Sequence, residues 1–264
     1  MILYTLQALF LFVGTSYKNK YSKVSDIYDT YVNSNYDIDF WLKECSKEDE
    51  VLELTSGTGR VTLPLARAGI KVTALDISRE LLLQLRNKCK KEKLKVEILE
   101  ADMRDFNLGK QFPLVIIPFQ SIQELTSPSD HERTFKTVRK HLAAGGRFLV
   151  STHNTVLVSS KPSKLQMIGS YIHPKTKNRL EFWLSRKSNP KKHIGTAIQV
   201  YKEYNKAGKM VSRLVFRNSY YVFGKGEFEG LAKKTGFKIK NIYGDYSHKP
   251  FSQKSQYRIF ELVE

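Results

Sequence analysis

The sequence predicts an α/β fold in which a doubly wound, largely parallel sheet carries an inserted set of antiparallel β-hairpins. Two observations predict it. Between Glu50 and Ser151, short apolar runs alternate with helical patterns, which is typical of a parallel sheet covered by helices on both faces. After His153, apolar and polar residues alternate with period two between turn residues, which is typical of antiparallel hairpins. The 264 residues suffice for one large domain, which we expect to span residues 21–264 with an insert at about 160–222.

The first half supplies five expected strands and the helices between them. Leu114–Ile117 is apolar throughout, as in a strand buried on both faces. Ser78 is an expected helix N-cap with Glu80 in the first turn, and Gly69 is an expected helix end. The expected strands are Glu50–Leu54, Val72–Leu75, Val96–Leu99, Leu114–Ile117 and Arg147–Ser151; the expected helices are Val61–Ala68, Ser78–Lys90, Asp130–Leu142 with Gly145 and Gly146 as its end, and one or two between Val24 and Cys45.

The second half supplies the hairpin insert and the closing elements. The expected insert strands are Leu165–Ile172, Arg179–Arg186, Thr196–Tyr204 and Met210–Val222, separated by turns such as Asn189-Pro190 and Ala207-Gly208. A helix over Glu227–Lys234 and two strands, Lys238–Tyr243 and Tyr257–Val263, follow. These two strands bring the expected main sheet to seven.

Residues 1–20 and the two cysteines bear on the location of the protein. Met1–Val13 is almost wholly apolar but too short to span a bilayer. A packed or interfacial helix, a membrane tether and residues added by an upstream start codon remain open, and we favour residues 1–20 as an extension and linker outside the domain. Cys45 and Cys89 have no metal-ligand spacing, and two thiols in a chain of this length favour a reducing compartment. We therefore expect a cytoplasmic protein with no transmembrane span and no metal site.

The net charge is +18, and it is unevenly distributed. Residues 1–150 carry a net charge of +3, whereas residues 151–264 carry +15. A surplus of this size is typical either of a lysine-coated solvated surface or of a protein with an anionic partner. It raises two hypotheses for the second half, nucleic-acid binding and an anionic small-molecule substrate.

The segment from Glu53 to Gly59 is the sharpest local motif. An apolar strand ends in the acid Glu53, a loop of small residues follows (Thr55-Ser56-Gly57-Thr58-Gly59), and a helix begins. Glycines allow the backbone to approach a ligand closely, and the helix N-terminus offers unpaired N–H groups. The pattern lacks the third glycine of a dinucleotide-binding turn, because Thr62 stands there, and it lacks the lysine of a P-loop.

Two further acids follow the next two strands. An acid at the position of Asp76, at the end of the second strand, accepts hydrogen bonds from ribose hydroxyls in nucleoside-binding sheets. Asp102 follows the third strand, where a carboxylate can accept from an adenine amino group while the thioether of Met103 packs on the ring. In order along the chain, the loop and the two acids indicate a nucleoside-containing cofactor.

These motifs together resemble the class I S-adenosylmethionine-dependent methyltransferases, within which the sequence is similar to the small-molecule branch that includes glycine and sugar-amine N-methyltransferases. The likeness runs from about Tyr21 to the C-terminus and is most specific over Glu50–Phe119. Supporting segments are Asp26–Asp29, Tyr36–Trp41, Ala101–Phe106, Phe119–Leu125 and Tyr243–Tyr246. The resemblance implies a Rossmann-like seven-stranded sheet with the last strand antiparallel, S-adenosylmethionine as cofactor, S-adenosylhomocysteine as product, and no metal.

The resemblance also implies which residues bind the cofactor. They are Glu53, Thr55, Ser56, Gly57, Gly59, Asp76, Ile77, Asp102, Met103 and Phe119. One position departs from the family pattern, because Thr55 stands where the family usually has glycine. Threonine favours negative φ, so we expect the tight backbone positions of the loop at Gly57 and Gly59.

Acceptor contacts are expected beyond the fourth and fifth strands, where doubly wound sheets bind ligands. Gln120, Gln123 and Glu124 are the expected substrate-binding residues, and His153 and Tyr28 the expected catalytic ones. The insert is expected to cover the site as a lid and to set substrate choice. We predict methyl transfer to a nitrogen or oxygen of a small, anionic molecule, with Lys175, Lys177, Lys191 and Lys192 as candidate contacts, by a monomer or homodimer.

Two alternatives remain open. The charge of the second half would suit an RNA or protein methyltransferase, although Ile117–Gln120 lacks the Asn/Asp-Pro-Pro-aromatic sequence that would hold a base nitrogen. The unusual Thr55 would suit a regulator that binds the cofactor without turnover.

Overall fold

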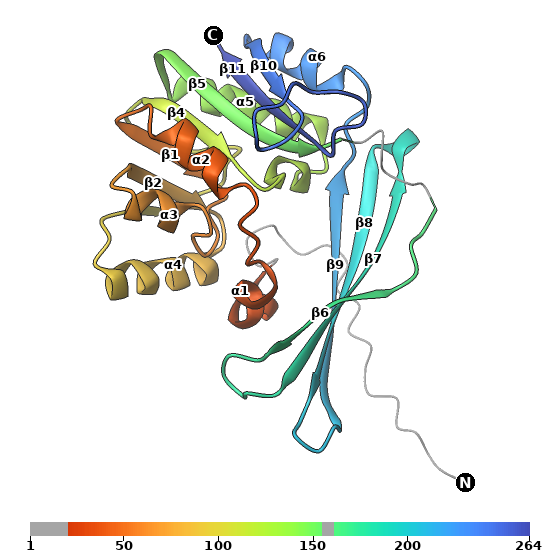
Figure 1. The fold of residues 1–264 in the computed structure, drawn as a ribbon. Coiled ribbons are helices and arrows are strands. Elements are labelled where there is room, and N and C mark those ends of the chain that lie inside the picture. Colours follow the sequence, from red (N-terminus) through yellow and green to blue (C-terminus); the bar gives the residue numbers. More distant parts are fainter. Residues whose placement is uncertain (1–20, 155–160) are drawn as a thin grey trace.

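The computed structural model describes residues 21–154 and 161–264, and its core is a seven-stranded sheet with helices on both faces (Figure 1). The strand order is β10-β11-β5-β4-β1-β2-β3. The strands are β1 (Glu50–Leu54), β2 (Lys71–Asp76), β3 (Glu97–Glu100), β4 (Phe112–Ile117), β5 (Leu142–His153), β10 (Lys238–Tyr243) and β11 (Tyr257–Val263). The expected extension, residues 1–20, lies outside the described residues.

Strand directions confirm the predicted sheet. β1 pairs in parallel with β2 and β4, β2 with β3, and β4 with β5. β11 runs antiparallel to both of its neighbours, β5 and β10. The chain order reverses between β1 and β4, so the carboxyl ends of these strands form the switch point where open α/β sheets bind ligands.

Helices cover both faces because successive side chains of the buried strands point to opposite faces. Val51 and Leu114 pack with helices α2, α3 and α4, whereas Leu52 and Val115 pack with α5 and α6. The helical elements are η2 (Ser22–Ile27), α1 (Tyr28–Tyr31), α2 (Ile38–Cys45), α3 (Thr62–Arg67), α4 (Arg79–Glu92), η3 (Ser121–Glu124), α5 (Pro128–Lys140), η5 (Pro190–Lys192) and α6 (Glu227–Lys234). Within the described ranges, no helix is long and apolar enough to cross a membrane.

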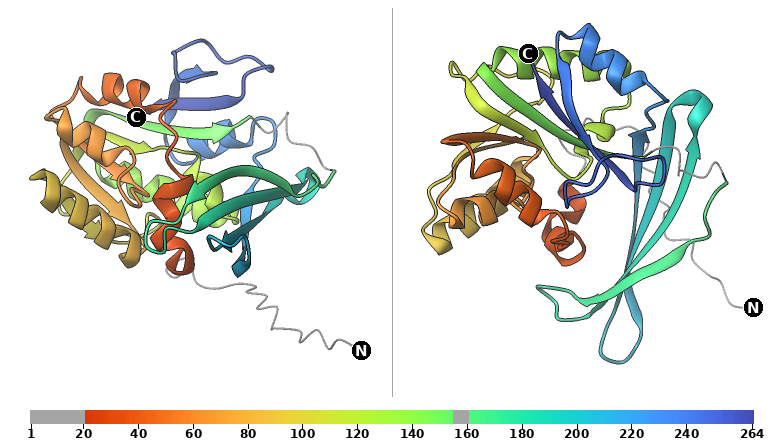
Figure 2. Two further views of the ribbon diagram at one scale, coloured as in Figure 1. Left: turned by 60° about the horizontal axis from the view of Figure 1, so that its bottom comes forward. Right: turned by 45° about the horizontal axis from the view of Figure 1, so that its top comes forward.

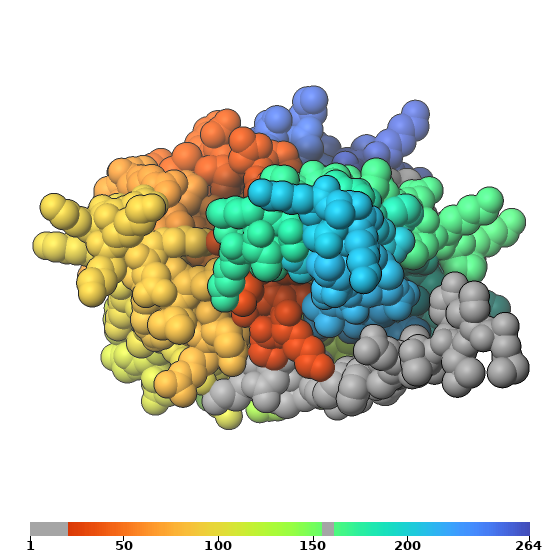
Figure 3. Space-filling view, turned by 90° about the horizontal axis from the view of Figure 1, so that it is seen from below, coloured from red at the N-terminus to blue at the C-terminus, as the bar shows by residue number. Residues whose placement is uncertain are grey.

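The insert forms a separate antiparallel sheet that packs against the N-terminal helices. Its strands, in spatial order, are β6 (Gln166–Ile172), β7 (Arg179–Asn189), β8 (Ile194–Tyr204) and β9 (Met210–Tyr221). Val24 and Ile27 of η2 are buried against Leu180, Phe182 and Tyr201 of this sheet. Figures 2 and 3 show η2 and α1 between α4 and the four-stranded sheet. The four-stranded sheet therefore supports the N-terminal segment, which we define as residues 21–31, on the side away from α4.

One expected boundary is wrong. The helix expected over Asp130–Leu142 begins at Pro128 and ends at Lys140, and Gly145 and Gly146 lie inside β5 rather than at a helix end. The pairing of β4 with β5 shifts register in this region, and Gly145 has a φ of +74°. The two glycines therefore serve an irregularity in the strand, which is a common role for glycine in sheets.

Candidate active site

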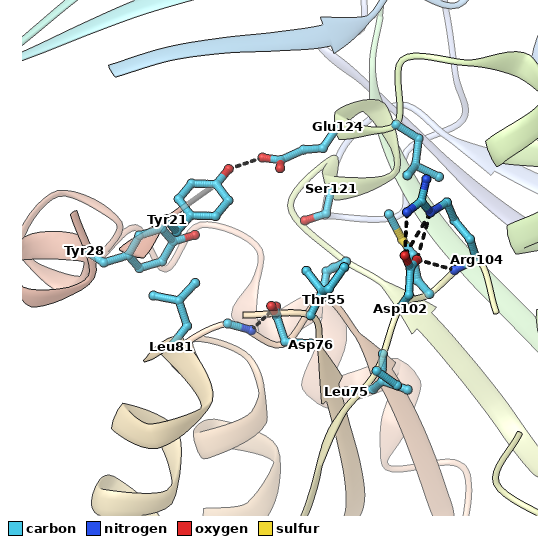
Figure 4. A pocket seen from close by; sticks show the side chains of 15 residues that line it. Tyr21, Tyr28, Thr55, Leu75, Asp76, Leu81, Asp102, Arg104, Ser121 and Glu124 are labelled. Atoms are coloured by element: carbon cyan, nitrogen blue, oxygen red, sulfur yellow. Dashed lines mark hydrogen bonds and ion pairs between the residues drawn. The ribbon is translucent and has the colours of Figure 1, made fainter. Parts of the chain in front are cut away.

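A pocket of about 680 Å³, including its open mouth, lies where β1, β2 and β3 end and the N-terminal segment crosses them (Figure 4). Eight expected site residues line it: Tyr28, Thr55, Gly57, Asp76, Ile77, Asp102, Met103 and Glu124. Seven other residues complete the lining: Tyr21, Leu75, Leu81, Ala101, Arg104, Ser121 and Leu125.

The loop after β1 approaches the pocket through an unusual backbone. Gly57 has a φ of +54° and Gly59 a φ of +90°, as expected for the tight positions. A Cβ on Gly59 would lie 2.4 Å from Cδ1 of Leu85, so this glycine allows the loop to pack on α4. Gly57, by contrast, faces the pocket, and only a methyl group of Leu81 would come within 4 Å of its Cβ.

Thr55 corrects an expectation. We expected negative φ at this position, but Thr55 has a φ of +61°, in the left-handed region that glycine adopts freely. Its hydroxyl donates to the carbonyl oxygen of Leu54. The chain thus keeps the backbone geometry for which the family usually uses glycine, at the cost of conformational strain.

Replacing Thr55 with glycine should therefore stabilise the protein. The left-handed conformation costs an L-residue ~1–2 kcal/mol, and the greater freedom of glycine in the unfolded chain returns part of that, leaving a gain of about 0.5–1 kcal/mol. Gly57→Ala, two residues away at a φ of +54°, should lower stability by a similar amount. Thermal unfolding of both variants measures this. A lower melting temperature for Thr55→Gly would show that its hydroxyl bond outweighs the strain.

Asp76 joins the glycine loop to the start of α4. Its Oδ2 accepts from the backbone N–H of Gly57 at 2.8 Å, and its Oδ1 accepts from the N–H of Ser78 at 2.8 Å. The side chain is buried, and burial raises the pKa of the carboxyl to about 6 although the backbone N–H groups oppose the shift. The remaining lone pairs of a carboxylate in this position can accept from ligand hydroxyls.

Asp102 and Met103 lie in the pocket as the sequence predicts, but Asp102 has a partner that we did not predict. The guanidinium of Arg104 donates to both carboxylate oxygens, at 2.6 Å from Nη2 to Oδ2 and 3.0 Å from Nε to Oδ1. Burial opposes ionisation, but these bonds hold the pKa of Asp102 below its usual value. Arg104 also pairs with Asp130 on α5 at 3.1 Å. The Asp-x-Arg spacing within the sequence could have revealed this pair.

Tyr21 and Tyr28 close the pocket from the N-terminal segment. Their rings meet edge to face with centroids 5.5 Å apart, and the Tyr21 hydroxyl donates to the carboxylate of Glu124 on η3. Burial raises the pKa of both phenols well above the usual value, so the hydroxyls stay protonated. We did not predict Tyr21, and because 103 residues separate it from Glu124, no local sequence signal could have found this contact.

Asp29 fastens the same segment to the glycine loop. Thr58 Oγ1 donates to Asp29 Oδ1 at 2.5 Å, and Lys88 Nζ pairs with Asp29 Oδ2 at 2.5 Å. Lys88 also donates to the carbonyl oxygen of Thr58 at 2.9 Å. These bonds tie the segment that covers the pocket to the loop and to α4.

Seven expected site residues lie outside the pocket lining: Glu53, Ser56, Gly59, Phe119, Gln120, Gln123 and His153. Glu53 is buried beneath the loop and accepts from Thr62 Oγ1 at 2.6 Å; burial raises its pKa to about 8. The hydroxyl of Ser56 is buried with no hydrogen-bond partner. The ring of Phe119 lies under the guanidinium of Arg60, 4.3 Å away.

The two glutamines and His153 belong to the framework around the pocket. Gln123 donates through Nε2 to the carbonyl oxygen of Tyr221 and accepts through Oε1 from the N–H of His153, so both polar atoms bind backbone. Gln120 donates to the Tyr246 hydroxyl at 2.8 Å. Burial lowers the pKa of His153 to about 4, which makes it a poor base at neutral pH. In the structure these residues make positioning contacts, and their expected substrate-binding and catalytic roles stay predictions.

The insert packs beside the N-terminal helices. Tyr21 and Tyr28 cover the described pocket, whose lining includes no residue of β6–β9. The buried face of the hairpins packs on η2 and α1, and the role of the insert as a lid that sets substrate choice stays a prediction.

Comparisons with known proteins agree with this architecture. Residues 51–146 match the family model of a methyltransferase domain. A putative methyltransferase of Bacillus subtilis, YqeM, is 24% identical over 246 residues, covering 91% of this chain and 96% of that protein. The fold is similar to an S-adenosylmethionine-dependent methyltransferase from Clostridium acetobutylicum (20% identity, TM-score 0.75, 92% and 98% coverage). It is likewise similar to the CcbJ methyltransferase of Streptomyces caelestis (20% identity, TM-score 0.76, 94% and 97% coverage).

The matched segment contains the parallel strands β1–β4, the glycine loop and both strand-end acids, so the family match and the pocket concern the same part of the chain. Residues 51–146 are therefore a methyltransferase domain, and the fold around them is similar to that of S-adenosylmethionine-dependent methyltransferases.

Proposed function

We propose that the protein methylates a nitrogen or oxygen of a small molecule. The observation that carries the proposal is the buried carboxylate of Asp76, held in the pocket between the glycine loop and α4. In a nucleoside site an acid at this position accepts from the ribose. Gly57 would approach the methionine part, and Asp102 and Met103 would flank the adenine.

The charges of the pocket fit a cationic cofactor. Asp76, Asp102 and Glu124 all line it. S-adenosylmethionine, when bound, supplies a methyl group on a positively charged sulfur, which is already an activated leaving group. The contribution of this chain is therefore positioning, which can supply roughly 7–11 kcal/mol of barrier reduction.

Glu124 is the proposed proton acceptor in place of His153. An amine acceptor must be neutral when it attacks, so a base has to take a proton. Glu124 lines the pocket and accepts a hydrogen bond from the Tyr21 hydroxyl, whereas His153 lies outside the lining. The protonated phenols of Tyr21 and Tyr28 would orient the acceptor and exclude water.

A small acceptor suits the covered pocket and the structural neighbours. Tyr21 and Tyr28 of the N-terminal segment line the pocket, and Asp29 fastens this segment to the glycine loop and to α4. One neighbour is the sugar N-methyltransferase KedS8 of Streptoalloteichus (12% identity, TM-score 0.69, 98% of both chains covered). The basic second half keeps RNA as the alternative acceptor.

Calorimetry and a turnover assay test the proposal. The protein should bind S-adenosylmethionine and S-adenosylhomocysteine, and should release S-adenosylhomocysteine in the presence of a small amine or phenol. Incubation with total RNA at two salt concentrations provides the comparison. Methyl incorporation into RNA but not into small molecules would replace the proposed acceptor, and cofactor binding without any turnover would favour the regulator.

A further inference from the structure

The guanidinium of Arg186 lies near His153, at the carboxyl end of β5, and pairs with no acid of the described residues. It lies on β7, two residues after Leu184 and four after Phe182, so it shares their face of the strand, which packs toward the N-terminal helices. Its side chain is exposed, and in the described ranges no carboxylate forms an ion pair with it. Most other arginines of the described chain, such as Arg60 and Arg147, are paired with acids.

An unpartnered hydrogen-bond acceptor lies on the same face. Arg186 is opposite Ala197 on β8, and Ala197 is opposite Asn218 on β9. The side-chain oxygen of Asn218 is buried and has no hydrogen-bond partner. Arg186, Ala197 and Asn218 form a row across three strands. This row consists of a cation, a small side chain and a carboxamide oxygen without a partner. A buried polar atom without a partner is uncommon in proteins and suggests a ligand that supplies one.

β9 contacts η3, the element that carries Glu124 of the pocket lining. Tyr221, at the end of β9, accepts through its carbonyl oxygen from Gln123, which in turn accepts from the N–H of His153. Gln123 directly precedes Glu124 of the pocket lining. The positive charge of Arg186 acts on both His153 and Tyr220. Burial lowers the pKa of His153 and raises the pKa of Tyr220, and the charge of Arg186 adds to the first shift and opposes the second. In Figure 1 this end of the four-stranded sheet is the one nearest β5 and β11.

A series of aromatic contacts leads from His153 to the residues that follow β4. The ring of His153 stacks on Tyr257 at 5.7 Å, and Tyr257 contacts Tyr246 at 5.1 Å. The hydroxyl of Tyr246 accepts from Gln120, which follows β4. Arg186 thus lies near the His153 end of this series of rings, and Gln120, which follows β4, lies at the other end.

We propose that Arg186 binds an anionic group, a carboxylate or a phosphate, of the methyl acceptor, that Asn218 Oδ1 accepts a hydrogen bond from an N–H or O–H of the same molecule, and that the reactive atom reaches the pocket. The inference rests on the proposed function because it concerns the acceptor of that reaction. It also relocates the expected anion contacts. Lys175 is already paired with Asp26, and Lys177 donates to the carbonyl oxygen of Pro174 in the β6–β7 turn.

Matched acceptor analogues test the proposal by binding, without a need for turnover. The full chain is saturated with S-adenosylhomocysteine, and ligand-observed NMR titrations compare para-aminobenzoate with para-aminobenzamide and glucosamine phosphate with glucosamine. The anionic member of at least one pair should bind about tenfold or more tightly than its neutral partner, as expected for a charge-assisted contact. The preferred pair distinguishes a carboxylate from a phosphate.

Two variants assign the preference to Arg186. Arg186→Glu should abolish it, and Arg186→Lys should retain part of it. Lys187→Glu is the matched control, because Lys187 is the next residue on β7, is also exposed and points to the opposite face. Equal binding within both pairs, or an anion preference that survives Arg186→Glu, would overturn the proposal. If the unmodified chain does not bind S-adenosylhomocysteine, this result would instead contradict the proposed function.

Discussion

Replacing Asp76 with alanine will weaken S-adenosylhomocysteine binding by about 100-fold or more. The carboxylate is the buried charge at the centre of the pocket, and each hydrogen bond from a ligand hydroxyl to a charged group contributes roughly 1.5–3 kcal/mol. Two such bonds account for the expected change, since ~1.4 kcal/mol is a factor of ten. The variant also leaves the N–H groups of Gly57 and Ser78 without their acceptor, so the loop loses its geometry. Calorimetric titration measures the affinity.

Asp105→Ala is the matched control. Asp105 follows the third strand as Asp102 does, but its side chain is largely exposed and lies outside the pocket lining. We expect it to bind as the unmodified chain does. Asp76→Asn removes the charge and keeps the side-chain shape, but its NH2 group replaces one of the two acceptors of the Gly57 and Ser78 N–H groups, so its melting temperature is measured alongside. Binding by Asp76→Ala within a few-fold of the Asp105→Ala variant would refute the ribose assignment.

The pH dependence of binding provides a second check on Asp76. Burial raises the pKa of this carboxyl to about 6, so the empty site is largely protonated at pH 5 and largely ionised at pH 7. A protonated carboxyl has lost part of its acceptor capacity. Affinity should therefore rise as the pH increases from 5 to 7 and level off above, with a midpoint near 6, and Asp76→Asn should remove this rise.

The sequence predicts the bounds of an element correctly where residues close together in the chain determine them. The bounds of β1, α6, β10 and β11 agree with the predicted ones, because the apolar pattern of each element and the turn residues that flank it are visible locally. Gly145 and Gly146 were misinterpreted because their role depends on the pairing of β5 with β4, some thirty residues earlier in the chain. Local patterns contain the period of a strand, but they do not contain the register between strands.

The same limit applies to the site. Asp76 and Asp102 could be placed from sequence because parallel strands bring their carboxyl ends to one edge. The contacts that set the environment of the pocket are long-range. Tyr21 forms a hydrogen bond with Glu124, and Arg60 forms an ion pair with Asp37. Each contact joins residues far apart in the chain, and no local sequence pattern predicts it. Thr55 shows a different limit, because propensity argued against a left-handed φ that the surrounding loop imposes.

We expect Arg60→Ala to lower the free energy of unfolding by about 3–5 kcal/mol, the largest loss of stability among the variants proposed for this protein. Arg60 donates to both oxygens of Asp37, at 2.5 and 2.8 Å, and to the carbonyl oxygen of Ser34 at 2.9 Å. The Asp37 side chain is fully buried, so removing the guanidinium leaves a buried carboxylate with Trp41 Nε1 as its remaining side-chain donor. For a domain of this size the melting temperature should fall by about 6–20 °C.

Arg67→Ala is the matched control, since Arg67 also binds a carboxylate through two bonds, to Glu92, but on the exposed surface. Its melting temperature should stay close to that of the unmodified chain. The double variant Arg60→Met/Asp37→Asn should be more stable than Arg60→Ala, because it removes the buried charge together with its partner. If Arg60→Ala unfolds like Arg67→Ala, the Asp37 pair does not hold the N-terminal segment. The closure of the pocket by Tyr21 and Tyr28 would then depend on the Asp29 contacts and on the packing of η2 against the four-stranded sheet.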